Sequence, residues 1–395
     1  MNQLIQEKIA QAVGILNEFN IDCWITFVRE SGINGDPTLP FLVEEDVTWH
    51  SAFIIHKDGT KHAIVGRYDK QTIEELGVYN NVIGYVEGVK KPLQAHLQEK
   101  NPTKIAINYS KGSEICDGIT FGMYLTLVDI LSEIEMEKRL ISAEKVVSAL
   151  RERKSDEELR RIKKAVAITE EIWSAVAQYM KAGMTEQQIA DFVHQQIKNR
   201  GVECAWDAPF CPAVFSGIGE AEAHYSPTNK KIQRGEIVNM DFGVKYRDYV
   251  SDTQRIFYIL KEGETEAPED VQHGVQAVIH SIDAAKNGMK PNVQAFEIDA
   301  IARNIIIENK YDGFPHGLGH QLGRFVHDGT ALMGPLWEKY ANKPLQYLEE
   351  NMVFTIEPRV TVPKRGQASI EEMVIVTKNG CEWLTNPQKE IILIS

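Results

Sequence analysis

The 395-residue sequence contains, at residues 237–252, the stretch IVNMDFGVKYRDYVSD, which predicts a β-hairpin. Apolar and β-branched residues on both sides of a short charged segment are typical of two antiparallel strands. A two-residue turn closed by Lys245 and Asp248 would place Asp241 directly opposite Asp252. Two facing carboxylates repel each other, and a buried pair is tolerated when a cation lies between them. The alternative is that both acids lie on a solvated face of the hairpin.

A second hairpin is predicted near the C-terminus. The sequence reads MVFTIE at residues 352–357 and SIEEMVIV at 369–376, with the turn-forming segment PKRG at 363–366 between them. Antiparallel pairing places Glu357 opposite Glu371. Neighbouring strand residues point to opposite faces, so only one of Glu371 and Glu372 can face inward, and the pattern leaves both open. Two hairpins with opposed acids indicate a cation site.

A third segment is rich in histidine and glycine. Residues 314–329 read FPHGLGHQLGRFVHDG and include His316, His320 and His327. Glycines allow the backbone to approach a site closely. One imidazole with four carboxylates suits a pair of divalent ions such as Mn²⁺, Co²⁺, Fe²⁺ or Zn²⁺. His224 is a further candidate. The other histidines are expected to be structural or on the surface: His50, His56, His62, His96, His194, His273 and His280.

Helical patterns precede each hairpin. Ser155 followed by Glu158 is a capping box that starts a helix near Asp156, and Thr185 with Gln188 starts another that ends at Gly201. Two more helices are expected at 269–287 and 293–310. A helix–helix–hairpin unit thus occurs twice, which predicts two similar halves within one domain of residues 151–395.

Residues 1–150 are expected to form a separate small domain. A helical pattern begins at Ile5, and strand-like runs follow at residues 22–28, 51–56, 62–65 and 104–108. Helices between these strands predict a mixed α/β sheet. We find no motif here that carries chemistry.

Composition excludes several classes of protein. The formal net charge is −13, from 43 basic and 56 acidic residues, which argues against nucleic acid or an anionic membrane as the main partner. The sequence has no long uncharged run of the kind that spans a membrane. Five scattered cysteines form no disulfide framework and predict a reducing, cytoplasmic location.

Five motifs follow one another along the C-terminal part of the chain: HYSPTN (224–229), DFGVKYRDYVSDTQR (241–255), HGLGHQLGRFVHD (316–328), FTIEP (354–358) and IEEMVIVT (370–377). Together they resemble the metallopeptidases of the methionine aminopeptidase or "pita-bread" fold, most closely the proline-specific Xaa-Pro aminopeptidases and Xaa-Pro dipeptidases (prolidases). The resemblance implies an α/β (α+β) protein, with an N-terminal mixed-sheet creatinase-like domain and a C-terminal pita-bread domain of pseudo-two-fold halves.

The resemblance also implies roles for residues. The metal ligands would be Asp241, Asp252, His320, Glu357 and Glu371, which chooses Glu371 over Glu372. Glu357 would in addition handle protons. His224 and His327 would face the substrate, and His316 would be structural.

The implied activity is hydrolysis of the bond between an N-terminal residue and proline, in dipeptides or longer peptides. It would depend on two divalent ions, with Mn²⁺ first and Co²⁺, Zn²⁺ or Fe²⁺ as alternatives. The partners would be a small peptide and a second copy of the chain, through or around the N-terminal domain. Three rivals share the fold: a methionine aminopeptidase, a creatinase-like amidinohydrolase and a non-catalytic binding protein.

One departure from the family pattern concerns arginine. The family segment before the last acid usually reads Arg-Ile-Glu, whereas this chain has Ser369 before Ile370 and Glu371. The usual Thr-Arg after the second Asp is Gln254-Arg255 here. Arg359 and Arg365 are the candidates to compensate.

Overall fold

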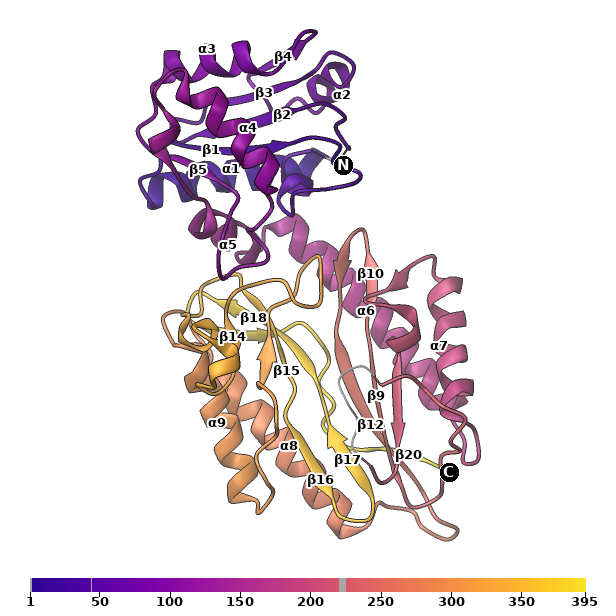
Figure 1. Ribbon diagram of the computed structural model, residues 1–395. Coiled ribbons are helices and arrows are strands. Elements are labelled where there is room, and N and C mark those ends of the chain that lie inside the picture. Colours follow the sequence, from indigo (N-terminus) through magenta and orange to yellow (C-terminus); the bar gives the residue numbers. More distant parts are fainter. Residues whose placement is uncertain (1, 44, 220–224) are drawn as a thin grey trace. The chain divides into compact units, whose positions relative to one another are not determined.

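A computed structural model describes residues 2–43, 45–219 and 225–395 (Figure 1). The chain divides into two compact units. Unit 1 comprises Met1–Arg151 and Ser155–Glu157, and unit 2 comprises Glu152–Lys154 and Glu158–Ser395. Among the described residues we find no helix that combines the length and apolarity of a membrane crossing.

Unit 1 is built on a six-stranded mixed sheet in the order β4-β3-β2-β1-β5-β6. The sequence pattern predicted a mixed sheet, and parallel and antiparallel pairs both occur. Its strands are β1 (Cys23–Val28), β2 (Ser51–His56), β3 (Lys61–Gly66), β4 (Asn81–Tyr85), β5 (Ile105–Ile107) and β6 (Leu140–Ser142). Its helices are α1 (Asn2–Glu18), α2 (Lys70–Glu75), α3 (Lys90–Lys100), α4 (Phe121–Ser132) and α5 (Glu144–Glu152), with 3₁₀ turns η1 (Leu39–Phe41) and η2 (Glu137–Arg139).

Helices cover both faces of this sheet, because β1 is apolar on both sides. Trp24 packs into a core with residues of α1 and α5, whereas Ile25 packs into a second core with residues of α3 and α4. A strand buried on both faces reads as a continuous apolar run, as CWITFV does.

Unit 2 repeats a pair of helices followed by strands. The first half contains α6 (Asp156–Tyr179), α7 (Glu186–Asn199), β7 (Glu203–Cys204), η3 (Ala208–Phe210), β8 (Ala213–Ser216), β9 (Ile237–Phe242), β10 (Val244–Tyr246), β11 (Tyr249–Val250) and β12 (Thr253–Ile259). The predicted start of α6 at Asp156 is confirmed. The Thr185–Gln188 capping box at the start of α7 is confirmed as well.

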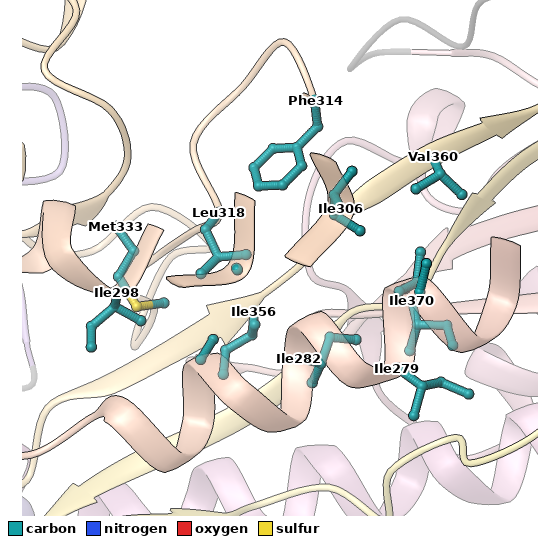
Figure 2. Packing of buried hydrophobic residues seen from close by; sticks show 14 of the residues in the cluster. Ile279, Ile282, Ile298, Ile306, Phe314, Leu318, Met333, Ile356, Val360 and Ile370 are labelled. Atoms are coloured by element: carbon teal, nitrogen blue, oxygen red, sulfur yellow. The ribbon is translucent and has the colours of Figure 1, made fainter. Parts of the chain in front are cut away.

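The second half contains α8 (Glu269–Gly288), α9 (Ala295–Glu308), β13 (Gly319–His320), β14 (Leu332–Met333), η4 (Glu338–Tyr340), η5 (Lys343–Leu345), β15 (Val353–Ile356), β16 (Arg359–Val362), β17 (Gly366–Ser369), β18 (Glu372–Thr377), β19 (Gly380–Trp383) and β20 (Ile392–Ile394). Ile279 and Ile282 of α8 pack in one buried cluster with Ile356 of β15 and with Ile370, which lies between β17 and β18 (Figure 2). The equivalent core of the first half lies between α6, α7 and strands β9 and β12. The predicted repeat of helices and strands is therefore present.

The first hairpin has a different register from the predicted one. The turn residues are Arg247 and Asp248, both with positive φ (47° and 66°), and Tyr246 pairs with Tyr249. Asp241 therefore lies opposite Gln254 and not opposite Asp252. Two consecutive residues with positive φ form the primed turn that matches strand twist. The shift is two residues, so Asp241 and Asp252 still point to the same face.

The second hairpin has the predicted register. Ile356 pairs with Glu372 in β15 and β18, and Arg359 pairs with Ser369 in β16 and β17. Glu357 and Glu371 occupy the opposed positions between these two ladders. The halves of unit 2 join here, because Gln254 bridges to Glu371.

Candidate metal centre

Three side chains from separate parts of unit 2 converge on one point. Asp252 precedes β12, His320 lies on β13, and Glu371 precedes β18; a ligand atom of each lies within 4.8 Å of the others. His320 Nε2 is 3.9 Å from Asp252 Oδ2 and 4.0 Å from Glu371 Oε1. A fourth group, Glu357, places its Oε1 3.5 Å from the same nitrogen. One imidazole therefore lies among three carboxylates.

Asp241 completes the group from β9. The charge of Asp241 acts on the nearby carboxyls of Asp252 and Glu357, and Gln254 Nε2 donates to Asp241 Oδ2 at 3.3 Å. Asp241 Oδ1 is buried and has no hydrogen-bond partner among the described residues. The same holds for Glu371 Oε2. Buried oxygens without partners are costly, so these two mark where a cation would bind.

Burial and mutual repulsion perturb every ionisable group of the cluster. Burial raises the pKa of Asp241 to about 7. Burial, followed by neighbouring carboxylates, raises the pKa values of Asp252 and Glu371 well above the usual range. The pKa of Glu357 is raised by burial and by Asp241. Burial lowers the pKa of His320 to about 3, so the imidazole is neutral and able to act as a ligand. A neutral imidazole and four clustered acids fit a divalent metal site.

Close backbone packing sets the position of His320. A Cβ atom on Gly319 would lie 2.0 Å from Thr355 O, so only glycine lets β13 approach β15 this closely. His320 N donates to Thr355 Oγ1 at 3.1 Å, and Glu357 N donates to Leu318 O at 2.7 Å. The glycines of the third motif therefore bring His320 beside Glu357.

Glu372 has a different environment from Glu371. Its carboxylate pairs with Arg255, with Nη1–Oε1 and Nη2–Oε2 distances of 3.1 Å. Thr385 Oγ1 donates to it at 2.6 Å and Gln388 N at 2.8 Å. These contacts occupy its oxygens and turn it away from the cluster, which leaves Glu371 to face His320.

A cavity of about 680 Å³ opens over the acidic group. His327 lines it, with its ring 4.4 Å from that of His320 at an angle of 75°. His316, expected to be structural, lines the cavity too, and burial lowers its pKa to about 4. His224 lies outside the described residues. Its neighbour Tyr225 lines the cavity and donates to Glu186 Oε2 at 2.8 Å.

The arginines named as candidates to compensate for Ser369 lie in different places. Arg359 lies directly across from Ser369 in the β16–β17 ladder, and among the described cavity-lining residues it is the one lysine or arginine. Arg365 instead pairs with Asp270 at 3.0 Å. Arg255 Nη1 donates to Glu371 O at 2.9 Å, which anchors the backbone at that residue.

Sequence reasoning missed the aromatic wall of the cavity. Trp206, Phe210, Phe215 and Tyr340 line it, and all four lie outside the five motifs. Their spacing carries no periodic signal, because they are brought together only by the packing of both halves of unit 2.

Comparisons with known proteins agree with this geometry. A family model described as metallopeptidase family M24 matches residues 160–378. A Pyrococcus horikoshii protein named Xaa-Pro dipeptidase is 31% identical over 277 residues, which cover 70% of this chain and 74% of that protein. An uncharacterized peptidase of Staphylococcus aureus (strain bovine RF122 / ET3-1) is 27% identical, covering 86% of this chain and 88% of its own length.

Solved structures share the fold over nearly the whole chain. The X-Pro aminopeptidase from Thermotoga maritima MSB8 matches with a TM-score of 0.70 at 23% identity, covering 98% of this chain and 99% of that one. The prolidase from Pyrococcus horikoshii OT3 matches with a TM-score of 0.69 at 24% identity and the same coverage. Fold and site together define a class of protein. Its members have an N-terminal mixed α/β domain, followed by a pita-bread domain with a carboxylate–histidine site. The chain belongs to metallopeptidase family M24.

Proposed function

We propose that this protein hydrolyses the peptide bond between an N-terminal residue and proline, using two divalent metal ions. The observation that carries the proposal is the buried acidic cluster with two unpartnered oxygens at the floor of a 680 Å³ cavity. The residues that would hold the ions are Asp241, Asp252, His320, Glu357 and Glu371. Mn²⁺ is the proposed ion, since it accepts carboxylate-rich sites with one imidazole; Co²⁺, Zn²⁺ and Fe²⁺ are the alternatives.

The side chains of this site have distinct tasks. When bound, the ions supply Lewis-acid polarisation of the scissile carbonyl and lower the pKa of a water. Glu357 would accept the proton of the attacking water and pass it to the leaving nitrogen. His327 would donate a hydrogen bond to the carbonyl oxygen as negative charge develops there. His224 is proposed for the same face of the substrate on sequence grounds.

Proline specificity is supported by the relatives and by the chemistry of the bond. An Xaa-Pro bond is a tertiary amide without an N–H, so a site for it must be shaped around the ring. Trp206, Phe210 and Tyr340 provide an apolar cavity wall. The relative with 31% identity is an Xaa-Pro dipeptidase.

The test is an assay of metal-free and reconstituted protein. Chelator-treated protein should be inactive, and Mn²⁺ should restore cleavage of Xaa-Pro dipeptides and Xaa-Pro-Xaa tripeptides but not of matched Xaa-Ala peptides. Metal analysis should give two ions per chain. Equal cleavage of Xaa-Ala peptides would overturn the specificity, and full activity without metal would overturn the whole proposal.

A creatinase-like hydrolase is the second candidate on this fold. Such an enzyme would not need the metal set, whereas this chain keeps all five acidic and histidine positions together in one cluster. The same metal analysis separates the two candidates, and it also separates an enzyme from a non-catalytic binding protein.

We also propose that the N-terminal domain, residues 1–150, serves oligomerisation or substrate access and that the chain forms a cytoplasmic homodimer. The domain of residues 151–395 would carry the chemistry. Light scattering should give twice the chain mass of 44.6 kDa. A monomer at micromolar concentration would reject the dimer.

A further inference from the structure

Two cysteines that the proposed chemistry does not use bracket one loop of the cavity wall. Cys204 ends β7 and Cys211 follows η3, and the loop between them reads AWDAPF. Trp206 and Phe210 of this loop line the cavity. Cys204 is half-buried and Cys211 is buried. A change at the base of this loop would therefore act on a wall of the cavity.

The two thiols and one histidine converge on the same backbone. Cys204 Sγ donates to Cys211 O at 3.4 Å, and His194 Nε2 lies 2.8 Å from that same oxygen. Cys211 Sγ donates to Gly243 O at 3.5 Å. The Cys204 sulfur and the His194 ring therefore meet at the backbone oxygen of Cys211, whose own sulfur is held against Gly243 O.

These contacts make Cys204 unlike the other thiols. The Cys211 hydrogen bond and then His194 lower the pKa of Cys204 to about 5, and Cys204 in turn raises the pKa of His194 to about 9. Burial raises the pKa of Cys211, with Asp241 adding to the effect. The three remaining thiols are buried with raised pKa values: Cys23, Cys116 and Cys381.

A metal ion does not explain this group. In the described part of the chain, the one set of three metal-ligating side chains close enough to share an ion is Asp252, His320 and Glu371. A thiolate beside an imidazolium, with a second thiol in contact, is instead the arrangement of an oxidisable cysteine pair.

We propose that Cys204 is a peroxide-reactive thiolate and that Cys211 resolves its oxidation product into an intramolecular disulfide at the base of the cavity-wall loop.

The chemistry balances with hydrogen peroxide as the oxidant. The Cys204 thiolate attacks one peroxide oxygen, an S–O bond forms, the O–O bond breaks, and the hydroxide that leaves takes up a proton to become water. The Cys211 thiol then loses its proton and attacks the Cys204 sulfur, so an S–S bond forms, the S–O bond breaks, and a second water leaves. Each sulfur loses one electron and peroxide gains two.

The disulfide would constrain the cavity wall. A disulfide requires the two sulfurs to be about 2.05 Å apart and the Cα atoms roughly 4.4–6.8 Å apart. Cys204 and Cys211 are seven positions apart, so the bond would fix both ends of the segment that carries Trp206 and Phe210. A dithiol reductant would release it.

The experiment treats the full-length, metal-loaded protein with hydrogen peroxide, blocks free thiols with iodoacetamide and maps peptides by mass spectrometry. We expect a Cys204–Cys211 disulfide that dithiothreitol removes. In Cys211→Ser, we expect a sulfenic acid on Cys204 that dimedone traps. Cys116 is the internal control, and it should react roughly 10-fold more slowly. This readout does not depend on peptidase activity.

A second measurement tests the role of His194 as a positioning residue. The groups that act on the two sulfurs are His194 on α7 and Asp241 on β9. His194→Gln should slow alkylation of Cys204 about 10-fold at pH 6.5 and leave it nearly unchanged at pH 9.5, because only the thiolate reacts. Equal oxidation of Cys204 and Cys116, or a trapped sulfenic acid in the unmodified chain with no disulfide, would overturn the proposal.

Discussion

Asp252 and His327 line the same cavity, but their replacement should have different effects on metal binding and turnover. Asp252→Asn should lose bound metal along with turnover, because a neutral amide is a poor ligand for two divalent ions. His327→Ala should keep both ions and lose roughly 10²–10³ in kcat, the usual effect of removing one preorganised donor. Metal content and kcat measured on both variants check this. Loss of metal from His327→Ala would place this histidine among the ligands and contradict the assignment.

Arg359 offers a second prediction at the scale of single residues. It lies across from Ser369, and its positive charge acts to lower the pKa of Glu357 against the effect of burial. A charged hydrogen bond to substrate or carboxylate contributes about 1.5–3 kcal/mol. Arg359→Ala should therefore reduce kcat/KM for Xaa-Pro dipeptides by roughly 10- to 100-fold.

The control for this prediction is Arg365→Ala. Arg365 pairs with the exposed Asp270, and Arg365 is not among the described residues that line the cavity. Its replacement removes only a surface ion pair, so kcat/KM should change by less than about twofold. Equal effects of the two substitutions would remove Arg359 from the site.

At the scale of elements, Gly319 sets how closely β13 approaches β15. An added Cβ would lie 2.0 Å from Thr355 O, and that atom belongs to the backbone and cannot rotate away. Gly319→Ala should cost about 3 kcal/mol or more of unfolding free energy and displace His320, which lowers metal affinity. Gly313→Ala is a matched control, since its Cβ would meet only the Arg303 side chain at 3.4 Å. Denaturant unfolding and metal titration of both variants check the difference.

The two hairpins show what the sequence could and could not specify. The PKRG segment has both proline and glycine, and the predicted pairing of Glu357 with Glu371 follows from it. Arg247 and Asp248 form a two-residue turn with positive φ but contain neither glycine nor asparagine, so the sequence predicts the turn one residue too early. The side-chain period of two kept the acids on one face despite the error. Turn position needs backbone detail, whereas the face of a strand does not.

Contacts between distant segments could not be predicted from the sequence. Trp206 and Tyr340 meet at one cavity only through packing of both halves of unit 2. His56 and His96 are expected to be structural or on the surface, and the sequence does not show that their Nε2 atoms lie 2.8 Å apart in unit 1. No local pattern reports such pairs, because periodicity describes which face a residue occupies and not what it meets there.

At the scale of whole units, this histidine pair predicts acid sensitivity of unit 1. Burial lowers the pKa of His56 to about 4 and that of His96 to about 3, and His62, Asp58 and Lys100 act on them as well. The unfolded chain binds protons near pH 6.5, so below that pH it holds more protons than the folded unit. The free energy of unfolding should fall as the pH drops from about 6.5 towards 4, on the order of 2 kcal/mol by pH 5.

Hydrogen exchange resolved by peptide measures this effect in β1 and β2 separately from unit 2. The double variant His56→Gln/His96→Gln should have a flatter pH dependence over the same range, whatever its stability at pH 7. An unchanged slope in the variant would show that other groups cause the acid sensitivity.

Metal removal should act on unit 2, because all five proposed metal ligands lie within it. An ion at 1,000 times its Kd adds about 4 kcal/mol to the folded state. For a unit of this size that corresponds to a change in Tm on the order of 10 °C. Chelation should therefore lower the Tm of unit 2, and Mn²⁺ should restore it, because four clustered carboxyls then regain a positive charge between them.

His320→Ala, which removes a proposed ligand, should respond much less to both treatments. Calorimetry with and without chelator decides the matter: an equal response in His320→Ala would mean that the stabilising ion binds elsewhere.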